Sequence, residues 1–261
     1  GETGEQTISL IAGTSISDND SSDAVDLTST NLRIVAGTFA GTGSNHIETT
    51  VQTITATTQS GGLYITESSA IEIDRLAQFT ANRVASDGSA AVTAATTDAA
   101  QEDLTVTGGN LVLQTESGSI SVDGGDDTTG IGSTGNILLQ TQEAGETAES
   151  TVDANITLKG LTASSGGSIS VISADSIHQT FADNEDESLA EDGDIRVSGG
   201  TGTIELYAAD SITMADGTIA QTADGNIRLE AGSGSMALSE IVAEGETGEQ
   251  TISLIAGTSI S

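Results

Sequence analysis

The amino-acid sequence predicts an all-β protein built as a parallel β-solenoid. Three observations predict this fold: a repeat of 17 residues at the two ends of the chain, a strand-like phrase that recurs along it, and a composition that suits a narrow interior. The repeat indicates the length of the structural unit, the phrase indicates its circuits, and the composition indicates what fills them.

The segment GETGEQTISLIAGTSIS occupies residues 1–17 and recurs unchanged at residues 245–261, an offset of 245 − 1 = 244 residues. Self-similarity at a fixed period is the sequence signature of repeat architectures. We therefore expect residues 1–244 to form one β-solenoid repeat unit and residues 245–261 to start the next identical repeat. The two copies should take the same conformation, and the first coil of each repeat should cover the last coil of the repeat before it.

A turn residue followed by alternating apolar residues recurs about every 30 residues. Such alternation over three to five residues is typical of strands. The first apolar residues of these phrases are Leu32, Leu63, Leu111, Ile137, Ile169, Ile195, Ile227 and Ile252. Eight phrases predict about eight coils per 244-residue repeat, each with roughly three short strands that stack on the next coil.

The composition fits such stacking. Pro, Cys and Trp are absent, aromatic residues are 2%, and there are 32 glycines. Proline cannot donate a hydrogen bond to a strand ladder, so its absence suits strands that are paired on both sides. The alternative fold, two or three β-sandwich modules, predicts aromatic cores and proline-marked boundaries, and both are missing.

Polar residues precede the first strand of several coils. They are Asn31, Asn110, Asn136 and Asn226, with Ser168 and Asp194 at the same place. Stacked coils would bring these side chains into a ladder that satisfies backbone groups at the corners. An ordinary turn residue at each site is the alternative.

Two regions break the rhythm. Residues 66–108 are rich in alanine and charge, and they predict either an irregular coil or an excursion that carries a short helix around Leu76, Phe79 and Val84. Residues 181–193 predict an acidic loop.

The charge balance excludes several partners. Six Lys and Arg residues face 39 Asp and Glu residues, a formal net charge of −33. Such a field repels nucleic acid and anionic lipid, so we expect no nucleic-acid partner. No apolar run of transmembrane length is visible, and we expect no membrane insertion in this segment.

Acidic clusters at flexible corners could bind calcium, which prefers several oxygen ligands. They occur at residues 18–20, 123–127 and 183–187. Asp123, Asp126 and Asp127 are the first calcium candidates, because Gly124-Gly-Asp126 partly matches the nonapeptide of calcium-binding β-rolls. Neither that nonapeptide nor the twelve-residue calcium loop is complete, so solvated acidic loops are the alternative.

The sequence does not favour catalysis, and we expect no enzyme. The two histidines, His46 and His178, are far apart in the sequence, and no cysteine or nucleophile elbow accompanies them.

Three arginines, Arg33, Arg196 and Arg228, share one position of the phrase. We expect them to point outward on one sheet, where Arg196 and Arg228 could be adjacent, and to pair with carboxylates such as Glu205 or Glu230.

The phrases GNILLQT, GNIRLEAGSGSMAL and GSISVISADSIHQ resemble the repeats of very large bacterial surface proteins of the filamentous-haemagglutinin type and of similar giant adhesins with β-strand repeats. The resemblance implies a right-handed β-helix, secretion, and a role in adhesion or in an extracellular fibre. The chain departs from that pattern in its longer, irregular coils and its heavier acidity, and no binding residue of the family can be transferred.

The sequence therefore predicts a structural repeat of a giant bacterial protein, extracellular or at the cell surface, that forms a stiff fibre, stalk or sheath. Its partners would be neighbouring copies of the repeat, end to end and by lateral bundling of rods. The alternative function is a calcium-dependent adhesin that binds glycans or another cell surface. A third hypothesis, an enzyme acting on acidic polysaccharide, needs a basic groove that six basic residues can hardly build.

Overall fold

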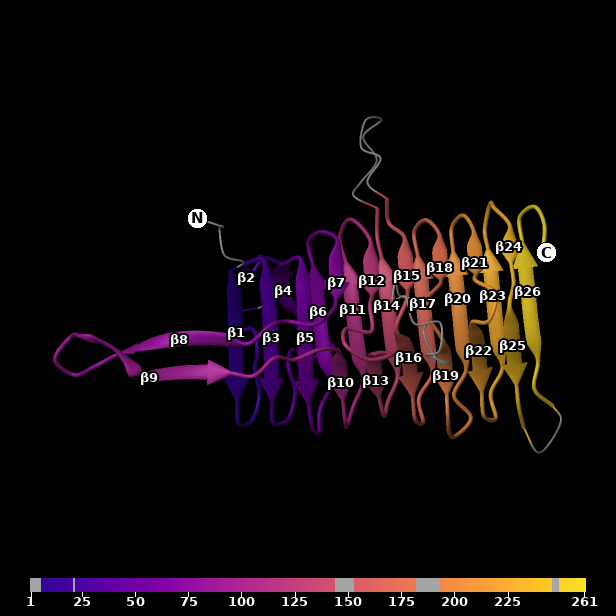
Figure 1. Cartoon of the computed structure of the whole chain (residues 1–261). Helices are drawn as coiled ribbons and strands as arrows, with labels where there is room; N and C mark the ends of the chain where they lie inside the picture. Colours follow the sequence, from indigo (N-terminus) through magenta and orange to yellow (C-terminus); the bar gives the residue numbers. More distant parts are fainter. Residues whose placement is uncertain (1–5, 21, 144–152, 182–192, 246–248) are drawn as a thin grey trace.

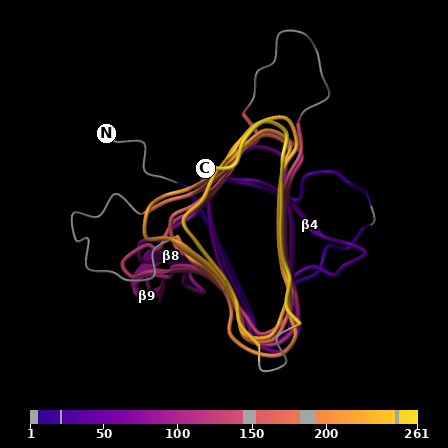
Figure 2. The same cartoon turned by 90° about the vertical axis from the view of Figure 1, so that its right-hand side faces the viewer.

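The computed structural model describes residues 6–20, 22–143, 153–181, 193–245 and 249–261. These residues form strands and no helix, and all pairs of strands outside one hairpin are parallel. The strands stack side by side along the molecule (Figure 1), and a view along the stack shows a coil of triangular outline (Figure 2). The predicted parallel β-solenoid is confirmed. Most of the predicted acidic loop at residues 181–193 lies outside the described residues.

One side of the triangle, which we call face 1, is a nine-stranded sheet. Its strands, in order, are β2 (Leu27–Thr28), β4 (Ile47–Thr50), β6 (Leu63–Glu67), β11 (Leu111–Thr115), β14 (Ile137–Thr141), β17 (Ile169–Ser173), β20 (Ile204–Ala208), β23 (Ile227–Ala231) and β26 (Ile252–Ala256).

A single column of paired residues runs through face 1. It passes through Ile16, Ala40, Leu63, Leu111, Ile137, Ile169, Ile204, Ile227 and Ile252. Nine positions enclose eight circuits, which agrees with the eight coils that the sequence predicts.

A fifteen-stranded sheet forms the other two sides. Face 2 contains β7 (Ile71–Ile73), β12 (Ile120–Val122), β15 (Ile156–Leu158), β18 (Ile177–Gln179), β21 (Ile212–Met214) and β24 (Met236–Ala237). Face 3 contains β10 (Leu104–Val106), β13 (Thr129–Ser133), β16 (Leu161–Ser164), β19 (Ile195–Val197), β22 (Ile219–Thr222) and β25 (Glu240–Ala243). At the N-terminal end, β1 (Thr7–Ala12), β3 (Asn31–Ala36) and β5 (Thr53–Thr58) are longer, and β5 pairs with both β7 and β10.

The interior consists of aliphatic side chains. Along most strands buried and half-buried residues alternate, and the largest fully buried side chains are those of leucine and isoleucine. Each inward side chain packs on its equivalents in the circuits before and after it. Ile227, inside the stack, is 0% exposed, whereas its neighbour Ile252 in the last circuit is 43% exposed. Burial in this fold therefore depends on having a circuit on both sides.

Polar side chains at the entrances of the strands link successive circuits. Asn110 Oδ1 accepts the backbone N–H of Asn136 at 3.0 Å, and Asn136 Oδ1 accepts that of Ser168 at 2.8 Å. Asn226 Oδ1 accepts the N–H of Thr251 at 2.7 Å. The predicted ladder forms along face 1, and its bonds run from side chain to backbone rather than from amide to amide.

The expected placement of the arginines was wrong. Arg228 lies on face 1, whereas Arg33 and Arg196 lie on the fifteen-stranded sheet, so Arg196 is not beside Arg228. The phrase at Ile195 belongs to face 3, and Ile204 occupies the place in face 1 that the phrase at Ile195 was expected to fill. The same pattern of turn and alternation serves all three faces, so a phrase identifies a strand without identifying its face.

Residues 66–108 contain an excursion without a helix, so the helical alternative was wrong. The strands β6 and β7 still belong to the solenoid, and the chain leaves it between Asp74 and Asp103. The excursion carries an antiparallel hairpin of β8 (Phe79–Val84) and β9 (Ala90–Asp98). A turn with Gly88 at φ +84° joins the two strands, and this conformation favours glycine. Figure 1 shows the hairpin extending past β1, away from the rest of the solenoid.

The hairpin interrupts the solenoid at a single residue position. Ile73 pairs with Ile54, and Leu104 pairs with Ala56. A single residue of β5, Thr55, lies between these two partners, so the excursion replaces one residue of the regular circuit. The rows of strands on both sides therefore stay in register.

We predict that the excursion can be removed without loss of the fold. Replacing residues 74–103 by one threonine should change the free energy of unfolding by about 1 kcal/mol or less, because the joined ends are already in place. Thermal melting by circular dichroism checks this. A control deletion of the same length, residues 104–133, removes β10 to β13 and should abolish cooperative melting. Equal damage by both deletions would contradict the assignment.

Candidate functional site

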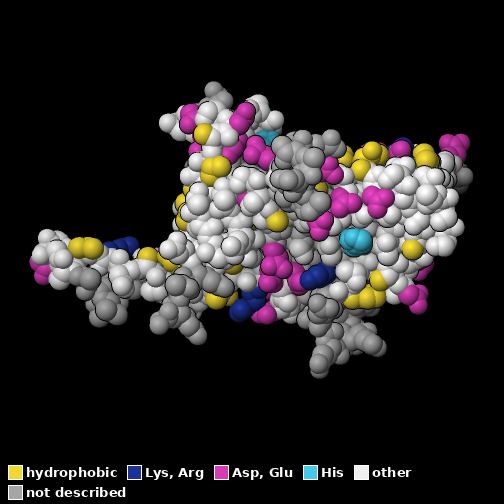
Figure 3. Space-filling model, turned by 90° about the horizontal axis from the view of Figure 1, so that it is seen from above, with side chains coloured by type: hydrophobic (Ala, Val, Ile, Leu, Met, Phe, Trp, Pro, Cys, Tyr) yellow, Lys and Arg dark blue, Asp and Glu magenta, His cyan; other side chains and the backbone are white. Residues whose placement is uncertain are grey.

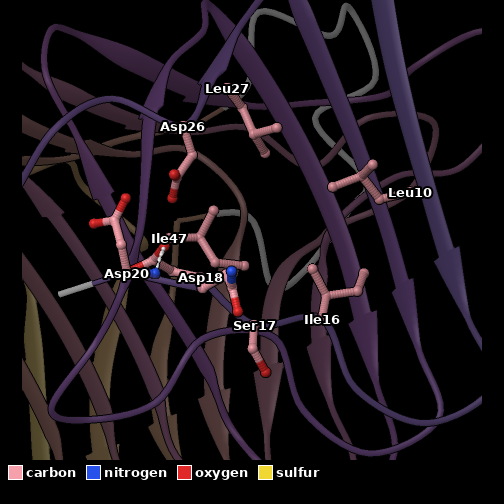
Figure 4. Close-up of a pocket in the computed structure, with 9 residues that line it drawn as sticks. Leu10, Ile16, Ser17, Asp18, Asp20, Asp26, Leu27 and Ile47 are labelled. Carbon is pink, nitrogen blue, oxygen red and sulfur yellow. Dashed lines mark hydrogen bonds between the residues drawn. The ribbon is translucent and has the colours of Figure 1, made fainter. Parts of the chain in front are cut away.

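A pocket of about 340 Å³ lies at the N-terminal end of the solenoid (Figure 4). Its apolar part comes from residues of the first circuits, and its acidic part comes from the loop between β1 and β2. The principal lining residues are Leu10, Ile16, Leu27 and Ile47 on the apolar side, and Asp18, Asp20 and Asp26 on the acidic side.

The three aspartates bring their carboxylate oxygens within 4.8 Å of one another. Among the described residues, these aspartates form the one group of three or more acidic or histidine side chains whose possible ligand atoms all lie this close together. The loop holds them through its own backbone: Asp20 N–H donates to Asp18 Oδ1 at 2.9 Å, and Ser22 N–H donates to Asp20 Oδ1 at 2.7 Å. Asn45 Nδ2 donates to the carbonyl oxygen of Asp20 at 2.7 Å and ties the loop to the next circuit.

A fourth carboxylate lies close to this group. Glu48, on β4, is 8% exposed, and its Oε2 has no hydrogen-bond partner among the described residues. Burial raises the pKa of Glu48 to about 7, and the negative charges of Asp26, Asp18 and Asp23 contribute to the rise. The ion pairs of the described residues do not involve these carboxylates.

This arrangement suits a divalent cation. Calcium takes carboxylate and carbonyl oxygens in a flexible geometry, and Asp18, Asp20 and Asp26 are the described residues that could hold it. A cation would offset the mutual repulsion of the three carboxylates and the cost of the nearby buried Glu48.

The carboxylates predicted as calcium ligands have other partners. Asp123 lies 3.4 Å from Lys159 Nζ, and Asp126 lies 2.6 Å from Arg75 Nε. Asp127 Oδ1 accepts a backbone N–H at 2.7 Å. The three lie together in the loop between β12 and β13, where two basic side chains already offset their charge. The acidic cluster at residues 183–187 lies outside the described residues.

Sequence reasoning noted Asp18 and Asp20 as an acidic pair but missed Asp26 and Glu48. Asp26 follows at a distance that no calcium motif marks. Glu48 comes from the next circuit, and only the stacking of the circuits brings it under the loop.

Three other ionisable groups that the sequence singled out, Arg228, Arg196 and His46, have structural partners. Arg228 pairs with Glu205 at 3.1 Å and with Glu230, as predicted. Arg196 pairs with Asp194 at 2.9 Å. His46 Nδ1 lies 2.8 Å from the hydroxyl of Thr66, and burial lowers the pKa of this histidine.

No family model matches the chain, and the comparisons with curated proteins and with solved structures give no match either. The described residues include no helix long and apolar enough to cross a membrane.

We predict that calcium binds at the loop of Asp18 and raises the melting temperature. At a calcium concentration about a hundred times the dissociation constant, binding should stabilise the fold by about 2.7 kcal/mol. Melting with calcium and with EDTA measures the effect, and the double substitution Asp20→Asn, Asp26→Asn should remove it. The substitution Asp126→Asn is the control, since it should leave the calcium effect intact. If Asp126→Asn removed the calcium effect and the double substitution did not, the calcium site would lie in the loop of residues 123–127 instead.

We predict that the stability falls as the pH rises toward 7. The carboxyl of Glu48 has a pKa of about 7 in the folded protein, against an ordinary value of 4.5, so the folded state binds its proton more tightly. The resulting stabilisation is complete below about pH 4.5 and disappears as the pH rises through 7. Glu48→Gln should weaken this dependence in calcium-free melts, whereas Glu240→Gln, at an exposed position, should not. Identical pH profiles for Glu48→Gln and the unsubstituted chain would contradict the prediction.

Proposed function

We propose that this chain is a structural repeat of a giant bacterial protein, extracellular or at the cell surface, in which successive repeats stack into one stiff rod. The observation that carries the proposal is the state of the two ends. Among the described residues, the strands β1 and β26 each pair on one side only, and the same duplicated sequence forms both.

Both ends have incomplete cores. Ile252 and Ile260 are 43% and 47% exposed, whereas the equivalent Ile227 and Met236 of the circuit beneath are fully buried. The apolar side of the pocket in Figure 4 is the other open end, where Leu10 and Ile16 have no circuit below them. An adjoining repeat would close both ends and remove their unpaired edges, which otherwise favour aggregation.

A rod also explains the surface. Most outward residues of the solenoid are polar, and the net charge of −33 keeps such rods apart in solution. Figure 3 shows acidic side chains on several parts of one face of the molecule and few basic ones. Lateral bundling of rods, if it occurs, needs cations between them.

A second candidate function is a calcium-dependent adhesin that binds glycans or another cell surface. The specific observation in its favour is the convergence of Asp18, Asp20 and Asp26. Loss of a calcium effect in melting would remove this candidate and leave the rod unaffected.

The rod can be tested with chains of one, two and three repeats. Eight circuits and a fraction, at about 4.8 Å each, predict a length of about 40 Å added per repeat. Small-angle scattering and electron microscopy of negatively stained particles measure this increment, and the melting temperature should rise as the share of open ends falls. Compact beads joined by flexible links would contradict the proposal.

A further inference from the structure

The duplicated segment is present twice in the structure, in two different settings. In both copies, within the described residues 6–17 and 250–261, a strand is followed by a two-residue bend and an isolated bridge. The first copy, in β1, pairs with β3 in the fifteen-stranded sheet, whereas the second, in β26, pairs with β23 in face 1.

The column of paired residues along face 1 shows how far the two copies are offset around the triangle. It begins at Ile16 and ends, eight circuits later, at Ile252, which is the duplicate of Ile8. A full repeat runs further, from Ile16 to its own duplicate, Ile260. The remaining step leads from Ile252 on face 1 to Ile260 on face 2. One repeat is thus eight circuits plus one face.

The two copies use different backbone groups. In the first copy, the carbonyls of Gln6 and Ala12 accept from β3 and the turn after it. In the second copy, the carbonyl of Thr251 accepts from Ile227, and the N–H of Gly257 donates to β23. Thr251 and Gly257 are the duplicates of Thr7 and Gly13, so the two sets of groups do not overlap. Alternate residues of a strand point to opposite neighbours, and one strand can make both sets of bonds at once.

The bend after the strand supports the same conclusion. A Cβ added to Gly13 would meet nothing within 4 Å, so the first copy does not explain this glycine. At the duplicate, Gly257, a Cβ would lie 2.6 Å from the carbonyl oxygen of Gly232. The glycine is required only where a preceding circuit is present.

We propose that successive repeats share this strand, so that β26 of one repeat is β1 of the next, and that each repeat is turned by one face of the triangle relative to the one before. The inference rests on the proposed rod and specifies its joint. Face 1 of one repeat continues into the row of β1, β3 and β5 of the next. Three repeats bring a given face back to the same side of the rod.

The joint gives the hairpin a partner. Asp98 of β9 accepts a hydrogen bond from Ser9 Oγ at 2.7 Å and lies 4.0 Å from Arg33, so the base of the hairpin rests on the outer side of β1 and β3. In the shared strand, Ser9 is Ser253, whose neighbour is Arg228 of the preceding repeat. Asp98 then lies between two arginines.

The rest of the hairpin extends beyond β1 (Figures 1 and 3), past the described strands of the solenoid. In the joined rod, this is the outer side of β23 and β20 of the preceding repeat. The outward residues there include Glu205, Tyr207 and Glu230. The partner surface for the hairpin is therefore the last circuits of the repeat before it.

The experiment uses a chain in which the segment 1–244 occurs twice in succession and the segment 245–261 closes the second repeat. Cysteines replace Glu230 in the first repeat and Val35 in the second. Glu230 pairs with Ile255, and Ile11, the residue that Ile255 duplicates, pairs with Val35. The proposal places the two cysteines two strands apart, about 10 Å, within reach of a short bismaleimide. The matched control is the pair Glu230→Cys with Thr28→Cys of the second repeat, on the first strand of face 1, which would come within reach of the same reagent only if repeats stacked without the turn.

The outcomes separate the joint from the rod. Cross-linking of the first pair and not of the control is the expected result. Cross-linking of the control pair overturns the one-face turn but is compatible with a rod. A straight particle in which neither pair cross-links overturns the shared strand. Two bodies on a flexible hinge, seen by electron microscopy, overturn the rod as well.

The hairpin contact has its own measurement in the same chain. A spin label on Val84→Cys should be less mobile in the second repeat, where the hairpin lies over the first repeat, than in the first repeat, where it lies over nothing. The two sites have identical sequence, so each is the control for the other. Equal mobility overturns the contact.

Discussion

The structure depends on one constraint: each circuit must satisfy the backbone hydrogen bonds of the next. A circuit does not contain a complete sheet, since along most of the described solenoid it contributes one short strand to each of the three faces. This explains the absence of proline from the whole sequence. It also explains the asparagines at strand entrances, because Asn110 and Asn136 carry the same ladder across corners where strand pairing begins. The cost of the arrangement falls on the two ends, where the end strand has a described partner on one side and unpaired donors and acceptors on the other.

The circuit number could be predicted from the sequence because alternation is a local property of a strand. The face of each strand could not. Ile195 and Ile204 stand in similar phrases, and only the lengths of the corners between them decide which one joins face 1. The excursion shows a related limit. An alanine-rich stretch around Phe79 permits a helix, but the facing segment β9 offers a second strand, and a tertiary partner overrides a weak local preference. Only part of the carboxylate site could be predicted from the sequence. Asp18 and Asp20 are close in sequence, whereas Glu48 comes near them only because the circuits stack.

The positions of the charged side chains also reflect the stacking of circuits. Carboxylates on loops, such as Asp20 and Asp26, can approach one another because a loop has room to adjust or to take up a cation. Within the rows of strands, repulsion between stacked equivalents would repeat at every circuit, about 4.8 Å apart. On face 1, Arg228 lies in register with Glu205 of the neighbouring strand and also pairs with Glu230, two residues further along its own strand.

A repeat that ended after a whole number of circuits would place every hairpin and every acidic loop on the same side of the rod. In the proposed rod the extra face prevents this, because the chain would leave each repeat one face further round than it entered. Loops that carry like charge are then spread around the rod instead of facing one another along one edge, and repulsion between them falls with distance and screening. The same step lets a hairpin from one repeat cross the joint onto the repeat before it. In the proposed rod, the length of the repeat therefore sets how far each repeat is turned relative to the one before it.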